Sequence, residues 1–166
     1  MRKILLIIVI LISTVSNSQS GTEKEKIEAV LNEWHKAAAE AKFDTYFGLM
    51  TANAVFIGTD PNENWDQKKF KAFAKPFFDK GRAWDFKSVE RNIYFAAKGE
   101  VAYFDELLDT WMKLCRGSGI MVKENGQWKI AQYVLSMTIP NDDTTEVIKI
   151  IEKNEDAYLE QIKKKR

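Results

Sequence analysis

The segment Ile120–Ile139, IMVKENGQWKIAQYVLSMTI, indicates best what kind of domain the chain forms. Two runs rich in aromatic and β-branched residues flank Asn125-Gly126, a dipeptide that is a strong signal for a tight β-hairpin. Strict alternation along the second run predicts two apolar faces, with Trp128, Ile130, Gln132, Val134 and Ser136 on one and Tyr133, Leu135 and Met137 on the other. An antiparallel sheet with two apolar faces must have both of them covered.

The residues before this segment continue the strand pattern. Trp84–Ala97 and Val101–Cys115 are also rich in aromatic and β-branched residues, and Lys98-Gly99-Glu100 separates them. Gly117-Ser118-Gly119 predicts a further turn before a strand at Ile120–Lys123. Consecutive strands joined by short turns indicate an antiparallel meander.

Helical patterns come first in the chain. Thr22-Glu23-Lys24-Glu25 is a capping box, and apolar residues then recur at helical spacing over Ile27–Ala41. A short second helix is expected over Asp44–Met50, followed by a buried strand over Ala54–Ile57. Asp66 can cap a third helix that carries a stripe of phenylalanines.

Proline and glycine mark the ends of these elements. Pro76 is expected to kink or shorten the third helix, and Gly81 to end it. After Pro140-Asn141 a final helix is predicted over Asp143–Lys163. Its inward residues are expected to be Val147, Ile151, Tyr158 and Ile162.

These patterns predict an α+β domain over residues 22–140. Its curved antiparallel sheet would carry about three N-terminal helices on the concave face, and residues 141–166 would add a C-terminal helix and a basic tail. Because the helices cover only one sheet face, the other face is expected to be covered by a partner sheet or by the C-terminal helix. We expect a homodimer through the outer sheet face.

Composition excludes several classes of protein. The 25 Lys and Arg residues nearly balance 24 Asp and Glu, which gives no reason to expect nucleic-acid binding. The single cysteine, Cys115, excludes an intrachain disulfide and a multi-cysteine metal site, and is expected to be a buried small hydrophobe. His35 is the only histidine, so no multi-histidine metal site is expected. No metal or organic cofactor is implied.

The first residues predict export. Met1-Arg2-Lys3 is a basic start, Ile4–Ile12 is an apolar run, and Ser13–Ser20 is small and polar. This is the pattern of a secretory signal peptide, which we expect to be residues 1–18, cleaved before Gln19. The apolar run is half the length of a bilayer span, so no stable membrane anchor is expected after cleavage. The predicted location is periplasmic or secreted.

Several segments resemble SnoaL-like domains of the nuclear transport factor 2-like superfamily. They are Trp34–Ala37, Ala54–Pro61 with Glu63 and Trp65, Gly99–Tyr103, Arg116–Gly119, and Gly126–Ile130 with the strand that ends at Ser136. The resemblance covers about Glu25–Pro140 and implies a cone of bent sheet closed on one side by three helices. The superfamily includes ketosteroid isomerase, polyketide cyclases, dehydratases and members without catalysis, so the resemblance implies a fold more than a reaction.

The ketosteroid isomerase pattern supplies a test for catalysis. That enzyme needs a carboxylate base that shuttles a proton, and a tyrosine and a protonated carboxylic acid that stabilise the enolate oxygen. The resemblance places the base at Asp60, before Pro61, and the tyrosine position at Trp34. No second acid aligns, although Asp105, Glu106 and Asp109 are available on the long strand. Two of the three roles are therefore unsupported.

Each candidate residue also has a purely structural interpretation. Asp60 is either a catalytic base or the first residue of an Asx turn. Arg116 either grips a ligand carboxylate or forms an ion pair at a strand end, and Ser136 is a further candidate for ligand contact. Four aromatic residues either line an apolar ligand cavity or fill the core: Trp34, Tyr46, Trp65 and Phe77. For His35 a packing role is favoured over catalysis.

Three hypotheses remain. The first is an exported module that binds a small apolar or amphipathic ligand in the cone. The second is a small acid–base enzyme of isomerase, dehydratase or cyclase type, with Asp60 as base and Trp34 or Tyr46 as donor. The third is a dimeric protein-interaction module. The missing catalytic roles favour the first.

Overall fold

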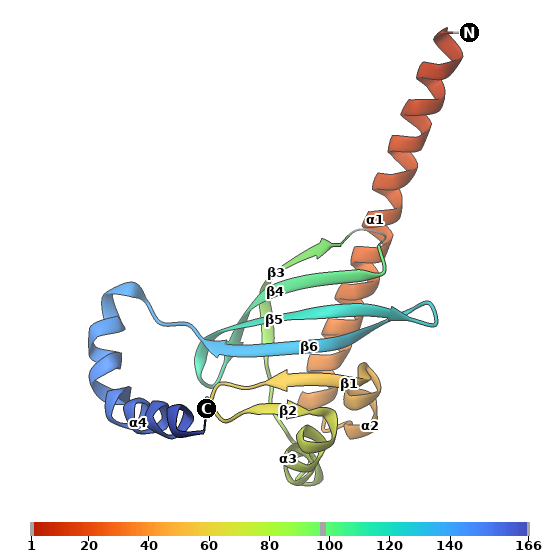
Figure 1. The fold of residues 1–166 in the computed structure, drawn as a ribbon. Coiled ribbons are helices and arrows are strands. Elements are labelled where there is room, and N and C mark those ends of the chain that lie inside the picture. The colour runs from red at the N-terminus through yellow and green to blue at the C-terminus, as the bar shows by residue number, and fades with distance from the viewer. Residues whose placement is uncertain (1, 97–98, 166) are drawn as a thin grey trace.

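A computed structural model of the chain describes residues 2–96 and 99–165, with side chains from Gly21 onward (Figure 1). Its elements are α1 Arg2–Ala39, α2 Phe43–Gly48, β1 Met50–Ile57, β2 Asn64–Asp66, α3 Gln67–Asp79, β3 Lys87–Phe95, β4 Val101–Thr110, β5 Lys113–Glu124, β6 Gln127–Met137, a 3-10 turn Asn141–Asp143 and α4 Thr144–Lys164. The signal peptide predicted over residues 1–18 lies outside the residues whose side chains are described. Among the described residues, no helix is long and apolar enough to cross a membrane.

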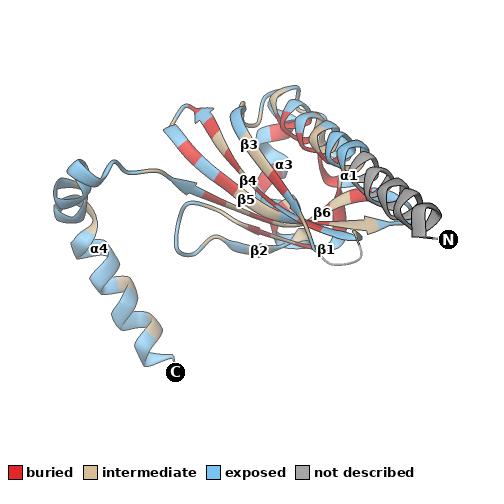
Figure 2. Cartoon of the chain, turned by 90° about the horizontal axis from the view of Figure 1, so that it is seen from above, coloured by how far each residue is buried: buried red, intermediate tan, exposed pale blue. Residues whose placement is uncertain are grey.

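The six strands form one curved sheet in the order β2-β1-β6-β5-β4-β3. Neighbouring strands are antiparallel except β1 and β6, which pair in parallel. The helices α1, α2 and α3 close one side of the sheet, and the buried residues lie between these helices and the strands (Figure 2). This arrangement confirms the predicted α+β class with helices over one sheet face.

Helix α1 buries one face, at the spacing that the sequence predicts. Ile27, Leu31, Trp34 and Ala38 are all at most 1% exposed, and they follow one another at intervals of four, three and four residues. The helix passes without a break through Thr22, so the prediction that it begins with a cap at Thr22 is wrong for the full-length chain. Removal of residues 1–18 would bring Thr22 close to a new helix end.

Helix α3 begins and ends where the sequence predicts, and Pro76 does not shorten it. The Asp66 carboxylate accepts the backbone N–H of Lys69 at 2.8 Å, which confirms the cap. The helix continues through Pro76 to Asp79, so Pro76 does not shorten it. Pro76 has no N–H to donate to the carbonyl of Ala72, one turn earlier in the helix. Both residues are exposed, so water can donate a hydrogen bond to that carbonyl instead. Gly81, with φ +81°, ends the segment as expected.

The turn between β4 and β5 lies where the sequence did not predict it. The strands are joined by Trp111-Met112, and Gly117-Ser118-Gly119 lies inside β5. The Thr110 hydroxyl fixes this hairpin, since it accepts the N–H of Met112 at 2.9 Å and donates to the Lys113 carbonyl at 2.9 Å. The prediction of a turn at residues 117–119 is therefore wrong.

Close packing explains these strand glycines. A Cβ on Gly117 would overlap the Tyr133 hydroxyl, and one on Gly119 would overlap the backbone carbonyl of Gln132 and the Phe104 ring. The two glycines therefore bring neighbouring groups close together and do not reverse the chain.

Strand β6 departs from strict alternation at a β-bulge. Ile130 pairs with Met121 and Gln132 with Ile120, so Ala131 is the extra residue. As a result Trp128, Ile130, Tyr133 and Leu135 are all buried on the inner face, whereas Gln132, Val134 and Ser136 lie outside. The predicted division of this strand into two apolar faces is wrong. The hairpin before it is confirmed, with φ +52° at Asn125 and φ +79° at Gly126.

Helix α4 stands away from the sheet (Figures 1 and 2). None of its residues is buried, and its half-buried residues are the four predicted to face inward, Val147, Ile151, Tyr158 and Ile162. The Tyr158 hydroxyl donates to the Pro61 carbonyl at 3.2 Å, which links the helix to the loop between β1 and β2.

Candidate functional site

An aromatic cavity of about 240 Å³ opens where α3 meets the ends of several strands and their loops. Eight of its fourteen lining residues are aromatic: Phe56, Trp65, Phe70, Phe73, Phe77, Trp84, Phe86 and Trp111. The other six are Gly58, Thr59, Glu63, Ala83, Met112 and Leu135. Phe73 and Phe77 are each 41% exposed and Trp111 is 80% exposed, so large apolar side chains face solvent at this cavity. Single exposed apolar residues are common, but a hollow lined by several is typical of a ligand site.

The aromatic rings hold one another in place. Helix α3 begins at the Asp66 cap, and its helical spacing directs Phe70, Phe73 and Phe77 toward the cavity. Trp65 stacks on Phe73 with 4.3 Å between ring centroids, and Phe56 of β1 stacks on Phe70 at 4.0 Å. These stacked contacts give the cavity a preformed wall.

Glu63 is the one charged side chain that lines the cavity among the described residues. Its Oε2 accepts the backbone N–H of Asp60 at 3.2 Å, and it has no ion-pair partner in the described part of the chain. Gly58 lies directly beneath it, because a Cβ at residue 58 would overlap the carboxylate. Backbone and loop therefore fix a carboxylate beside the aromatic walls.

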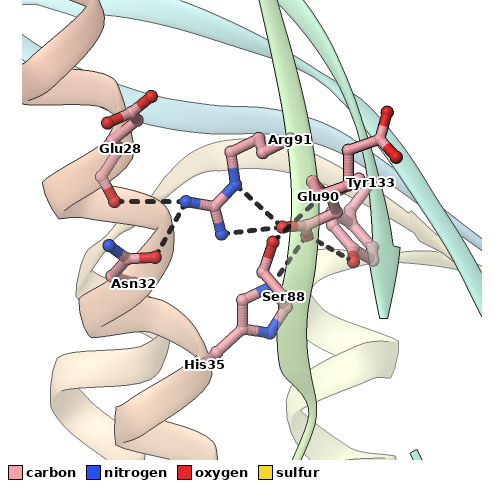
Figure 3. Close-up of polar contacts among 8 residues, drawn as sticks. Glu28, Asn32, His35, Ser88, Glu90, Arg91 and Tyr133 are labelled. Carbon is pink, nitrogen blue, oxygen red and sulfur yellow. Dashed lines mark hydrogen bonds and ion pairs between the residues drawn. The ribbon is translucent and has the colours of Figure 1, made fainter. Parts of the chain in front are cut away.

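A buried polar network lies deeper in the cone and is centred on Glu106, whose exposure is 0% (Figure 3). Its Oε1 accepts the Tyr133 hydroxyl at 2.9 Å and pairs with His35 Nε2 at 2.7 Å. Its Oε2 accepts Nε and Nη2 of Arg91 at 2.9 and 2.7 Å. Arg91 also donates to Asn32 Oδ1 at 2.8 Å, which connects β3 to α1.

These contacts keep Glu106 ionised. Burial alone raises the pKa of Glu106, but the hydrogen bond and charge of His35 and the Arg91 guanidinium outweigh it and lower the pKa from 4.5 to about 2. An ionised carboxylate only accepts hydrogen bonds, so His35 Nε2 must be the donor. Burial, and then the Glu106 charge, raise the pKa of Tyr133 well above 10.

The network supports the cavity from behind and does not line it. The His35 ring is 6.5 Å from Phe86, and the Tyr133 ring stacks on Phe56 at 5.8 Å. Phe86 and Phe56 both line the cavity, whereas His35 and Glu106 do not. The network thus holds aromatic walls in position, and its own ionisable groups do not line the cavity. His35 is thus buried and hydrogen-bonded, a positioning residue.

Sequence reasoning missed this network, although one signal was present. In β4 the inward residues alternate as Ala102, Phe104, Glu106 and Leu108, which puts a carboxylate on an apolar face. Such a position demands a buried partner. The sequence did not indicate that Arg91, from another strand, supplies it.

Two of the six predicted ligand residues line the aromatic cavity, Trp65 and Phe77. Trp34 and Tyr46 stack on each other in the core at 4.7 Å, and both are at most 1% exposed. Among the described residues, the Trp34 indole N–H and the Tyr46 hydroxyl make no hydrogen bond. Burial raises the pKa of Tyr46 well above its usual value.

Arg116 and Ser136 do not line the aromatic cavity. They face each other across β5 and β6 on the outer side of the sheet, where Arg116 pairs with Asp105 at 3.3 Å. Of the two interpretations of Arg116, the structure shows the ion pair at a strand end.

Asp60 lies in an exposed Asx turn. Its Oδ1 accepts the backbone N–H and the side-chain N–H of Asn62, at 2.9 and 3.0 Å, and these hydrogen bonds lower the pKa of Asp60. Asp60 faces an open hollow of about 500 Å³ between this loop and α4. It does not line the aromatic cavity.

The part of the chain that the structure describes holds no cluster of three or more His, Cys, Asp or Glu side chains suited to a metal. Cys115 is buried, as expected, and lies 3.6 Å from the Thr110 hydroxyl.

Comparisons with known proteins agree with this architecture. The family model of the SnoaL-like domain matches residues 27–140. An NTF2-like protein of unknown function from Pseudomonas putida is 14% identical, with a TM-score of 0.59 over 74% of this chain and 90% of its own. A proposed scytalone dehydratase from Novosphingobium aromaticivorans is also 14% identical, with a TM-score of 0.62 over 74% and 89%.

A third solved structure is an association domain. The association domain of the C. elegans kinase CaMKII is 15% identical, with a TM-score of 0.57 over 70% of this chain and 97% of its own. At these identities the likeness shows the fold alone. The search of curated proteins gave no match.

Proposed function

Since this chain belongs to the SnoaL-like domain family, with a nuclear transport factor 2-like fold, we propose that it is an exported protein that binds a small apolar or amphipathic molecule in the aromatic cavity. The single observation that carries the proposal is the cavity of about 240 Å³ with eight aromatic residues in its wall. A bound ligand would bury the exposed apolar surface of Phe73 and Phe77, which favours binding.

The acid–base alternative has less support. Asp60, the candidate base, is outside the aromatic cavity, and the candidate donors Trp34 and Tyr46 are buried in the core. The buried carboxylate that does have proton-bearing neighbours, Glu106, is already saturated by Arg91, His35 and Tyr133.

Binding of the neutral fluorophore N-phenyl-1-naphthylamine tests the proposed function. We expect its emission to rise when it is titrated with the protein recovered from an exporting host. The mass of this recovered protein also shows whether the mature chain begins at Gln19. Ala83 is half-buried in the cavity wall, so Ala83→Trp fills the space and should weaken binding at least ~10-fold.

The matched control is Ala72→Trp, on the exposed side of α3 and outside the cavity. It should leave binding within about twofold of the wild type. No rise in emission with wild-type protein, or equal losses in both variants, would contradict ligand binding in this cavity.

We further propose a homodimer through the outer sheet face, because that face carries exposed apolar residues. Tyr94 and Tyr103 stack there at 5.2 Å and are 47% and 52% exposed, with Val101 and Ile120 exposed nearby. The similarity in fold to an association domain agrees with assembly.

We expect Tyr103→Glu to convert the dimer to a monomer, since it places a charge in the centre of an apolar contact. Size-exclusion chromatography with light scattering measures the mass directly. Thr45→Glu, an exposed change on α2, should leave the dimer intact. A wild-type mass near 19 kDa for the full chain would argue against a dimer.

A further inference from the structure

The charge in the aromatic cavity is of one sign. Its wall consists of apolar and small residues, mostly aromatic, plus the Glu63 carboxylate, and no Lys, Arg or His lines it among the described residues. Glu63 has no ion-pair partner in the part of the chain that the structure describes. A carboxylate beside apolar walls loses hydration that no protein cation restores.

The nearby lysines are directed elsewhere. On α3, Lys71 lies over the Phe47 ring at 5.5 Å and Lys75 over the Phe43 ring at 5.7 Å. Neither Phe47 nor Phe43 lines the cavity. Helix α3 thus directs Lys71 and Lys75 away from its cavity phenylalanines. Lys69 pairs with Asp66 at 3.7 Å and does not line the cavity.

Arg82 and Lys87 are two further nearby cations. Arg82 lies 3.9 Å from Asp85. Both cations line an adjacent hollow with Trp84 and Trp111 and do not line the aromatic cavity itself. The described cavity wall therefore contains no basic side chain, although basic residues lie close to it.

We infer that the ligand of the aromatic cavity is an organic cation, with an apolar body and an ammonium group held at Glu63. Faces of Trp and Phe rings attract cations, and quaternary ammonium ligands are bound in cages of this kind. The Asp60 N–H fixes Glu63 Oε2, while Oε1 makes no hydrogen bond or ion pair within the described residues. This inference rests on the proposed binding function and adds the charge of the ligand to it.

The experiment compares two probes of the same shape. Benzyltrimethylammonium carries a positive charge, and neopentylbenzene replaces its nitrogen with carbon. Both are titrated into the full-length wild-type protein and into Glu63→Gln, with competition against N-phenyl-1-naphthylamine as the readout. The glutamine oxygen can still accept the Asp60 N–H, so the loop conformation is preserved.

We expect Glu63→Gln to weaken benzyltrimethylammonium at least tenfold and to change neopentylbenzene by less than twofold. Asp60→Asn removes a neighbouring charge outside the cavity and should change neither probe by more than twofold. Circular dichroism confirms that both variants are folded.

Two other results overturn the inference in different ways. If neopentylbenzene binds but benzyltrimethylammonium does not, or if Glu63→Gln leaves the cation unaffected, the ligand is not a cation and the apolar site remains. If neither probe nor the naphthylamine binds to the wild type, the proposed binding function fails as well.

Discussion

Glu106→Gln should lower the free energy of unfolding by about 3–5 kcal/mol, because it leaves a buried guanidinium without its carboxylate. The Arg91 side chain is 8% exposed and donates two hydrogen bonds to Glu106. A neutral amide cannot balance that charge. Urea denaturation followed by circular dichroism measures the change.

The control comes from the neighbouring residue on the same strand. Asp105 points to the outer face and pairs with half-exposed Arg116, so Asp105→Asn should change stability by less than about 0.5 kcal/mol. Should Glu106→Gln fail to fold, Tyr133→Phe removes one hydrogen bond and should cost about 1–2 kcal/mol. Equal, small effects at Glu106 and Asp105 would refute a structural role for the network.

The same residue sets part of the acid sensitivity. The folded pKa of Glu106, about 2, lies below its ordinary value of 4.5, so its contribution is present above pH 4.5 and is lost as the pH falls toward 2. Glu23 behaves alike, because hydrogen bonds from Lys123, Lys26 and Trp128 lower its pKa to about 2. The free energy of unfolding of Glu106→Gln should therefore fall less between pH 4.5 and 2 than that of the wild type. The decrease that is due to Glu23 should remain.

Gly119→Ala should cost about 3 kcal/mol, because the new methyl group meets backbone as well as a ring. A Cβ there overlaps the Gln132 carbonyl, which is fixed in the sheet, and approaches the Phe104 ring to 2.9 Å. Neither group can move without disturbing the pairing of β4, β5 and β6.

Ser118→Ala is the matched control, since Ser118 already has a Cβ and faces the outer side. It should change stability by less than about 0.5 kcal/mol. A tolerated Gly119→Ala would indicate that residues 117–119 form the exposed turn that the sequence predicted. Thermal and urea denaturation of the two variants distinguish these outcomes.

Features that depend on a few adjacent residues could be predicted from the sequence. The Asn125-Gly126 hairpin has the positive φ values that the dipeptide favours, and Asp66 caps α3 through a residue three positions away. The buried face of α1 follows from periodicity alone. Each of these signals is local, so no knowledge of the rest of the fold was required.

Features that depend on distant contacts could not be predicted. The glycines at 117 and 119 have the composition of a turn, and only the groups packed against them show why they lie in a strand. The bulge at Ala131 reverses the faces of β6 without any proline or glycine to mark it. A single extra residue was enough to bring residues from both predicted faces of that strand onto the inner side of the sheet.

The candidate site was predicted in part for the same reason. Trp65 and Phe77 line the aromatic cavity as expected, because an aromatic stripe on a capped helix has a foreseeable direction. The position of Glu63 could not be predicted, since nothing in the adjacent sequence shows that the loop folds its side chain over Gly58. The pairing of Glu106 with Arg91 joins two strands whose register no short motif specifies.

The parallel pairing of β1 with β6 also determines when the fold can be completed. Strand β1 ends at Ile57 and β6 ends at Met137. The ribosome therefore makes 80 further residues after β1 before β6 is complete and can pair with it. At about 5–20 residues per second this takes roughly 4–16 seconds, during which the β1–β2 hairpin has an open edge. The sheet of this domain therefore stays incomplete until β6 has been made, which leaves time for a chaperone to engage the open edge of β1 first.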